Sequence, residues 1–113
     1  MAESIARLAR MLCRDVADGE PDDWLLAAGF LAERQVASIV EGSFQVLSRA
    51  PHVAGHTIVA AGIGSGVVAT VAQRLGTPCV TFGELTGAAG DASAWTTRCA
   101  PAAALAMLGG SGD

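Results

Sequence analysis

The fold of this chain is decided by the stretch HTIVAAGIGSGVVATVAQRLG, residues 56–76. Residues 57–61 are β-branched or small and apolar, which is typical of a buried strand, and residues 67–75 return to helical spacing. Between them lie Gly62, Gly64 and Gly66, which allow a tight turn whose amides can approach a ligand at a helix N-terminus. The pattern predicts a phosphate-binding turn. A plain strand-to-helix turn that uses glycine only for close packing is the equal alternative.

The residues that follow extend this unit. Gly76, Thr77 and Pro78 end the helix, and residues 79–82 predict a second short apolar strand. The two strands should be parallel neighbours joined by a right-handed crossover, which makes a βαβ unit. Residues 83–98 lack a clear period and predict a loop that is either mobile or shaped by a ligand. A final helix is expected from residue 100 to 108, with residues 111–113 as a loose tail.

The N-terminal half predicts two amphipathic helices. The first covers residues 4–16 and is ended by Gly19, and the second runs from about residue 22 to 48. Pro21 opens the second helix, and Asp22 and Asp23 complement the positive end of its dipole rather than form a metal pair. Gly42 inside this helix indicates that another element packs closely there. Residues 51–55 are the loop that leads to the first strand.

Composition limits the functional classes. A chain of 113 residues is expected to form one domain, with a helical part at residues 1–50 and the βαβ unit and last helix at 56–108. Apolar residues make up 51% and charged residues 16%, which predicts apolar surface for a partner or a missing domain. The net charge of -4 and the absence of lysine exclude a nucleic-acid or polybasic membrane surface.

Metal and redox sites are not indicated. Cys13, Cys79 and Cys99 lie far apart, and only His52 and His56 accompany them, so zinc spacing is absent and reduced, structural thiols are expected. Both histidines precede the first strand and so belong at the end of the sheet away from a ligand. The N-terminus lacks the features of a signal peptide, and no stretch reaches about 18 apolar residues, so we expect a cytoplasmic protein.

The glycine turn also resembles two other phosphate or catalytic motifs. A dinucleotide fingerprint is half present, because Glu84 follows the second strand where an acidic residue would hold a ribose, but Val67 replaces the third glycine. Ser65 does not fit the nucleophile elbow of hydrolases and is better explained as an N-cap or a phosphate-contacting hydroxyl.

Arg98 and Glu84 are candidate ligand contacts or solvated surface residues. Trp95 either covers a ligand or anchors the loop to the core.

Four blocks in order carry a resemblance to a known family: ARLARMLCRD, AERQVASIVEGSFQVLSR, VAAGIGSGVVATVAQRLG and CAPAAALAML. The chain resembles the C-terminal portion of the tetrahydromethanopterin-linked one-carbon transfer proteins, which are related to the hydantoinase/oxoprolinase group. The resemblance implies a small, mostly helical α/β lobe similar to the C-terminal lobe of actin, sugar kinases and heat-shock chaperone ATPases. The adenosine motif of that superfamily would map onto Ala61, Gly62, Ile63, Gly64, Ser65 and Gly66.

The resemblance also implies a function. A related transferase of methanofuran synthesis releases pyrophosphate in the presence of magnesium, so the turn here would hold a diphosphate or a nucleotide phosphate. The predicted binding residues are Gly62, Gly64, Ser65, Gly66, Glu84 and Arg98, with no metal ligands and no assigned catalytic residue. The missing N-terminal lobe or a partner subunit would complete the site. The alternatives are a noncatalytic module whose apolar surface serves a homo-oligomer or a larger partner, and a compact Rossmann-like nucleotide-binding domain.

Overall fold

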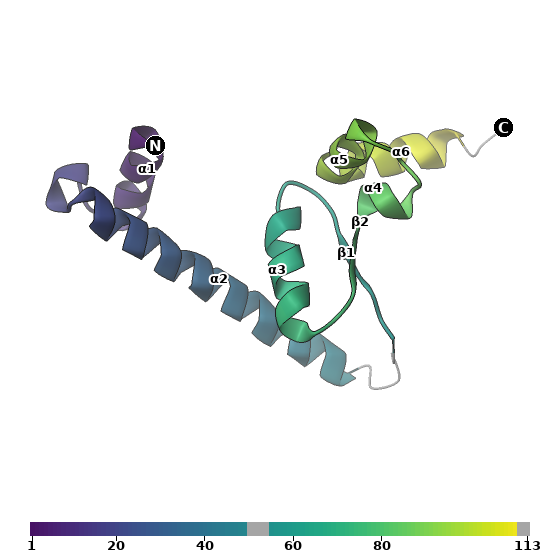
Figure 1. The fold of residues 1–113 in the computed structure, drawn as a ribbon, viewed down its shortest axis with the longest axis horizontal. Helices are drawn as coiled ribbons and strands as arrows, with labels where there is room; N and C mark the ends of the chain where they lie inside the picture. The colour runs from purple at the N-terminus through teal and green to yellow at the C-terminus, as the bar shows by residue number, and fades with distance from the viewer. Residues whose placement is uncertain (50–54, 111–113) are drawn as a thin grey trace. The chain divides into compact units, whose positions relative to one another are not determined.

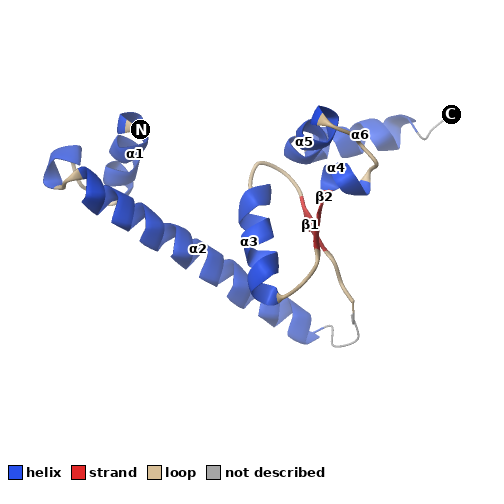
Figure 2. Cartoon of the chain, viewed as in Figure 1, coloured by secondary structure: helices blue, strands red, loops and turns tan. Residues whose placement is uncertain are grey.

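The computed structural model describes residues 1–49 and 55–110 as a mostly helical chain with two short strands (Figures 1 and 2). The elements in order are α1 (Ala2–Met11), the 3-10 helix η1 (Val16–Asp18), α2 (Pro21–Arg49), β1 (Ile58–Ala60), α3 (Ser65–Leu75), β2 (Cys79–Thr81), α4 (Phe82–Leu85), α5 (Asp91–Arg98) and α6 (Ala100–Gly110). They form a mixed α/β protein with two compact units, Met1–Ser38 and Ile39–Asp113, and α2 contributes to both. The predicted C-terminal tail, residues 111–113, lies outside the described residues. The predicted loop at residues 51–55, which includes His52, also lies outside them, apart from Gly55.

The N-terminal unit consists of α1, η1 and the first part of α2. Helix α1 ends earlier than predicted, at Met11, because Cys13 adopts a positive φ of 55° and the chain turns back, with the Arg14 amide donating to the Ala9 carbonyl at 2.9 Å. The prediction that Gly19 ends this helix is therefore wrong. Asp15 caps η1 instead, through a local capping box with Asp18.

Trp24 holds the N-terminal unit together. Its side chain is buried, and its Nε1 donates to the carbonyl oxygens of Val16 and Gly19 at 3.2 Å each. A buried indole with its N–H paired contributes apolar area without leaving an unsatisfied donor. Trp24 thus fixes η1 and the following turn against the start of α2.

Helix α2 follows the prediction closely. Pro21 is its first residue, and the Asp23 carboxylate accepts the Glu20 amide at 3.0 Å, which confirms the expected role of an acidic first turn. The interpretation of Gly42 is wrong, because a Cβ placed there would meet no atom within 4 Å in the described chain. Gly42 therefore leaves the helix surface open rather than packed.

The C-terminal unit is built around the predicted βαβ arrangement. β1 and β2 are parallel, with Ile58 opposite Cys79 and Ala60 opposite Thr81, and α3 packs on both strands (Figure 1). The buried core of this layer is small and consists of Ala60, Val71 and Ala72. Helix α3 ends as predicted at Gly76, which adopts the left-handed conformation at φ 65°.

The segment after β2 is helical and is not the loop predicted from its composition. α4 follows β2 without a gap and contacts both strands and α5, and α5 contacts α6. Thr81 and Glu84 form a reciprocal capping box that starts α4 directly at the strand end. α6 runs from Ala100 to Gly110, two residues beyond the predicted end. The helices α4, α5 and α6 therefore gather at the carboxyl ends of β1 and β2 (Figure 1).

Candidate functional site

The glycine turn lies between the end of β1 and the first residue of α3. Gly62 adopts a φ of +79°, which side-chain-bearing residues rarely tolerate, and the turn closes with the Ser65 amide donating to the Gly62 carbonyl at 3.3 Å. In the first turn of α3, the Val67 and Val68 amides both donate to the Gly64 carbonyl. The sequence therefore correctly predicted where the strand gives way to the helix.

Three amides of this turn have no acceptor among the described residues: those of Ile63, Gly64 and Gly66. They lie at the N-terminus of an eleven-residue helix, where the aligned peptide dipoles leave a partial positive charge. No side chain caps this helix end, because its N-cap residue is Gly64. The turn thus presents unpaired donors of the kind that bind phosphate.

The turn is also open to solvent within the described structure. A Cβ added at Gly64 or Gly66 would meet no atom within 4 Å, and the Ile63 side chain is 88% exposed. The alternative of glycines chosen for close packing finds no support at these two positions, because nothing packs there. Neither Gly64 nor Gly66 is therefore covered by a packed neighbour in the described structure.

Two residues of this turn that were predicted to contact a ligand, Gly62 and Ser65, differ in part from the prediction. The Gly62 amide donates to the Thr97 carbonyl at 2.7 Å, so it is already paired and holds the turn in place. Ser65 is not the N-cap, because that position is Gly64 and Ser65 is the first helical residue. The half-buried Ser65 hydroxyl makes no hydrogen bond among the described residues, so its predicted role as a phosphate contact stays open to test.

Thr97 connects the glycine turn with α4 and was not predicted from the sequence. Its backbone carbonyl accepts the Gly62 amide. Its side-chain Oγ1 accepts the Gly83 amide at 2.9 Å and donates to the Ser93 carbonyl at 2.9 Å, and the residue is 5% exposed. This one buried threonine therefore makes hydrogen bonds both to the segment that follows β1 and to the segment that follows β2. A threonine just before a helix end carries no sequence signal for such a role.

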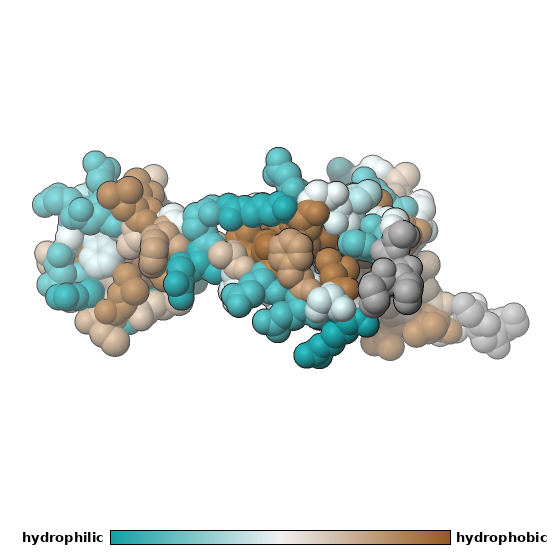
Figure 3. Space-filling model, turned by 90° about the horizontal axis from the view of Figure 1, so that it is seen from below, coloured by the Kyte–Doolittle hydropathy of each residue, from teal (hydrophilic) through white to brown (hydrophobic). Residues whose placement is uncertain are grey.

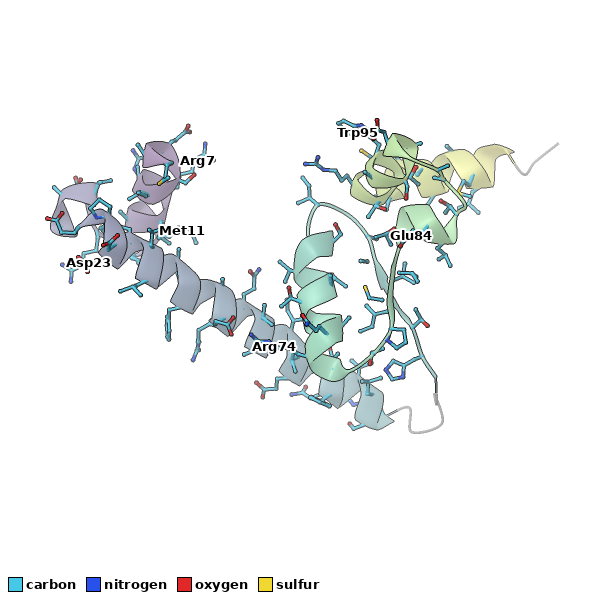
Figure 4. All side chains as sticks on the ribbon, viewed as in Figure 1. Arg7, Met11, Asp23, Arg74, Glu84 and Trp95 are labelled. Carbon is cyan, nitrogen blue, oxygen red and sulfur yellow. The ribbon has the colours of Figure 1, made fainter. Side chains whose placement is uncertain are left out.

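Glu84 lies on α4 beside this connection, next to Gly83 (Figure 4). Its Oε2 accepts the Thr81 amide at 2.8 Å and the Thr81 hydroxyl at 2.9 Å. These two hydrogen bonds, the backbone one first, lower the pKa of the exposed Glu84 carboxyl below its ordinary value of 4.5. Glu84 is consequently an ionised capping residue, and its carboxylate opposes rather than assists the approach of an anion.

Arg98 is the residue after Thr97. Its backbone is therefore adjacent to the Thr97 carbonyl, which accepts the Gly62 amide of the glycine turn. Its guanidinium lies over the Trp95 ring at 5.7 Å from the ring centroid, and no carboxylate among the described residues pairs with it. Trp95 is 65% exposed on α5, so its predicted role as an anchor to the core is wrong (Figure 4). Arg98 is therefore a cation that no carboxylate of the described residues neutralises.

The remaining candidate residues lie elsewhere. His56 is half-buried before β1 and its Nε2 lies 3.3 Å from the Thr77 hydroxyl, at the amino ends of the strands, as predicted. Cys13, Cys79 and Cys99, which were predicted to be reduced and mostly structural, are free thiols and are all exposed. None of these residues contributes to the turn.

Comparison with protein-family models, with curated proteins and with solved structures finds no match for this chain. The resemblance to the one-carbon transfer proteins thus stays a prediction that rests on the four sequence blocks. Across residues 1–49 and 55–110, no helix combines the length and apolar character needed to cross a bilayer.

Proposed function

We propose that the turn between β1 and α3 binds the phosphate groups of a diphosphate or a nucleotide. The observation that supports this most directly is the set of three unpaired amides, from Ile63, Gly64 and Gly66, at the open N-terminus of α3. Each amide could donate one hydrogen bond to a phosphate oxygen, and such charge-assisted bonds are about twice as strong as neutral ones. The helix dipole adds to this attraction.

Arg98 and Ser65 supply the side-chain part of the proposed site. Arg98 provides a positive charge without a carboxylate partner in the described chain, and its planar guanidinium can donate two parallel hydrogen bonds to a phosphate. The Ser65 hydroxyl can donate a further one. Glu84 contributes only indirectly, by holding the start of α4 through Thr81.

Magnesium enters the proposal only together with the phosphate ligand. No three carboxylate, histidine or cysteine side chains lie together within residues 1–49 and 55–110. Magnesium is usually held by one or two carboxylates together with substrate phosphates, so a diphosphate would bring the ion with it. We therefore assign no chemical step to the metal on this chain.

Within the family that the sequence resembles, this chain would be the C-terminal lobe of a transferase related to methanofuran synthesis. The free amides and Arg98 bind and orient phosphate, but none of the predicted site residues is a nucleophile with a partnered base. The reaction would accordingly need groups from another segment or subunit. Alone, the chain is expected to bind its ligand and to have no activity.

Calorimetric titration with pyrophosphate and with ADP, each with and without magnesium, tests the proposal. The wild-type chain should bind at least one of them saturably. The Gly64→Val variant should lose about tenfold or more in affinity, because a branched side chain would fill the space over the amides. Gly109→Val, at an open glycine of α6, is the matched control and should bind like the wild type. Equal binding by both variants would exclude this turn as the site.

Trp95 offers a second readout. In a Trp24→Phe background it is the only tryptophan, and its fluorescence should change when Arg98 moves from the ring to a phosphate. Arg98→Gln should weaken binding about fivefold to tenfold and abolish this change, since the cationic partner is lost. Arg34→Gln, on α2 in the N-terminal unit, should do neither.

A further inference from the structure

Thr97, the residue before the last of α5, is the buried polar residue of the described chain. The same chain leaves large apolar side chains at its surface, as Figure 3 shows, among them Phe30 and Phe44. Burying a hydroxyl while apolar groups stay exposed costs free energy unless the hydroxyl is hydrogen-bonded. Thr97 therefore lies where hydrogen bonds, rather than apolar burial alone, hold the elements together.

The carbonyl of Thr97 fixes the first residue of the glycine turn. It accepts the Gly62 amide at 2.7 Å, and the Gly62 carbonyl accepts the Ser65 amide at 3.3 Å. Gly62 is thus tied on one side to α5 and on the other to the start of α3. Ile63 and Gly64, which carry two of the three unpaired amides, lie inside this bridge. The directions of these amides therefore depend on where Thr97 holds Gly62.

The side chain of Thr97 fixes α4. Its Oγ1 accepts the Gly83 amide at 2.9 Å, and the contact between α4 and α5 is close, because a Cβ at Gly83 would lie 2.5 Å from the Ser93 Oγ. Tightly packed contacts have low compressibility and transmit a displacement to their neighbours. A movement of α4 therefore changes the position of Thr97, and with it that of the glycine turn.

We infer that Thr97 is a positioning residue that couples phosphate binding at the turn to the stability of α4 and α5. The inference rests on the proposed function, because it requires a ligand at the turn. A ligand that holds the turn also holds Gly62, and through Thr97 it holds Gly83. Coupling is reciprocal, so a change that loosens α4 weakens ligand binding by the same factor. Thr97 acts through these neighbours, since its own carbonyl and hydroxyl are already paired.

Hydrogen exchange of the full wild-type chain, with and without saturating pyrophosphate, measures this coupling. Bound pyrophosphate should slow the exchange of amides in α4 and α5 by about fivefold or more, because opening of these helices then also costs the ligand contact. Amides of α1, which belongs to the other compact unit, should exchange at the same rate in both samples. If the chain binds ADP rather than pyrophosphate, ADP is the probe.

Variants of Thr97 test the residue itself. Thr97→Val removes the acceptor of the Gly83 amide, so pyrophosphate should bind about fivefold more weakly and should no longer protect α4. Thr97→Ser keeps the hydroxyl and should restore both the affinity and the protection. Thr96→Val, at a side chain without a hydrogen bond in the described chain, is the matched control and should behave like the wild type. Affinities are compared at a temperature where circular dichroism shows each variant folded, so that lost stability alone does not change them.

The outcomes separate this inference from the proposed function. A wild-type chain that binds neither pyrophosphate nor ADP overturns both. A chain that binds one of them without slower exchange in α4 and α5 overturns the inference alone, and so does a folded Thr97→Val chain with the wild-type affinity. A Thr97→Ser chain as weak as Thr97→Val would show that the hydroxyl is not the link. The exchange experiment needs no variant, so it decides the question even where Thr97→Val does not fold.

Discussion

The backbone carbonyl of Thr97 accepts the amide of Gly62 at 2.7 Å, and this bond joins the last turn of α5 to the loop after β1. The side chain of the same threonine accepts the Gly83 amide after β2. Because both acceptors belong to one buried residue, the positions of the glycine turn and of α4 depend on each other. The glycine turn is therefore supported from a helix that lies more than thirty residues further along the chain.

Thr97→Val should lower the stability of the C-terminal unit. Valine keeps the shape of threonine but leaves the Gly83 amide and the Ser93 carbonyl without their buried partner, which costs about 1–3 kcal/mol. Thermal unfolding followed by circular dichroism measures the change. Thr96→Val, at the neighbouring threonine whose side chain makes no hydrogen bond in the described chain, should stay within about 0.5 kcal/mol of the wild type. If the two variants melt together, the Thr97 hydroxyl is not a structural acceptor.

Gly62→Ala should destabilise the turn by about 1–2 kcal/mol, because its φ of +79° is unfavourable for a residue with a Cβ. The space around the position is open, so strain in the backbone is the sole cause. Gly66→Ala adds the same methyl group inside α3 and should be neutral or slightly stabilising. Urea unfolding of the two variants gives the comparison. A Gly62→Ala chain as stable as Gly66→Ala would contradict the turn conformation described here.

Gly83→Ala tests packing rather than strain. A Cβ at Gly83 would lie 2.5 Å from the Ser93 Oγ and 2.7 Å from the Ser93 carbonyl carbon, so α4 and α5 would have to separate. Overpacking of this kind costs about 1–3 kcal/mol or more. Hydrogen exchange should show faster exchange in α4 and α5 and little change in α1. Gly42→Ala, which adds a methyl group in open space on α2, should instead stabilise its helix by up to about 1 kcal/mol. Unchanged exchange in α5 would show that the contact is absent.

The parts of the fold that local sequence determines could be predicted. The strand, glycine turn and helix of residues 58–75 depend on β-branched residues, glycine and helical spacing within one segment, and α2 depends on an uninterrupted helical stretch after Pro21. The free amides of the turn follow from the same pattern. These features were predicted because their causes lie within a few residues.

The parts that depend on distant contacts could not be predicted. α5 contains serine and threonines that disfavour helix, and it is held by the bonds of Thr97 to residues of the turn and of α4. The Gly62 amide could not be known to be paired, since its acceptor lies in that same helix. One signal for α4 was present in the sequence: threonine at 81 and glutamate at 84 have the spacing of a capping box.

Glu84 gives the fold a dependence on acidic pH. Its two bonds from Thr81 lower the pKa of the folded carboxyl below 4.5, so the unfolded chain binds the proton more readily. The stabilisation is therefore complete above the unfolded pKa and is lost as the pH falls through the folded pKa. Melting temperatures at pH 7 and pH 3 should differ less in Glu84→Gln than in the wild type, because the glutamine has no charge to lose. Glu41→Gln, at an exposed carboxyl of α2 with no hydrogen bond or ion pair among the described residues, is the control and should keep most of the wild-type difference. If Glu84→Gln instead falls in melting temperature by the full wild-type amount, the capping carboxylate does not favour the folded state.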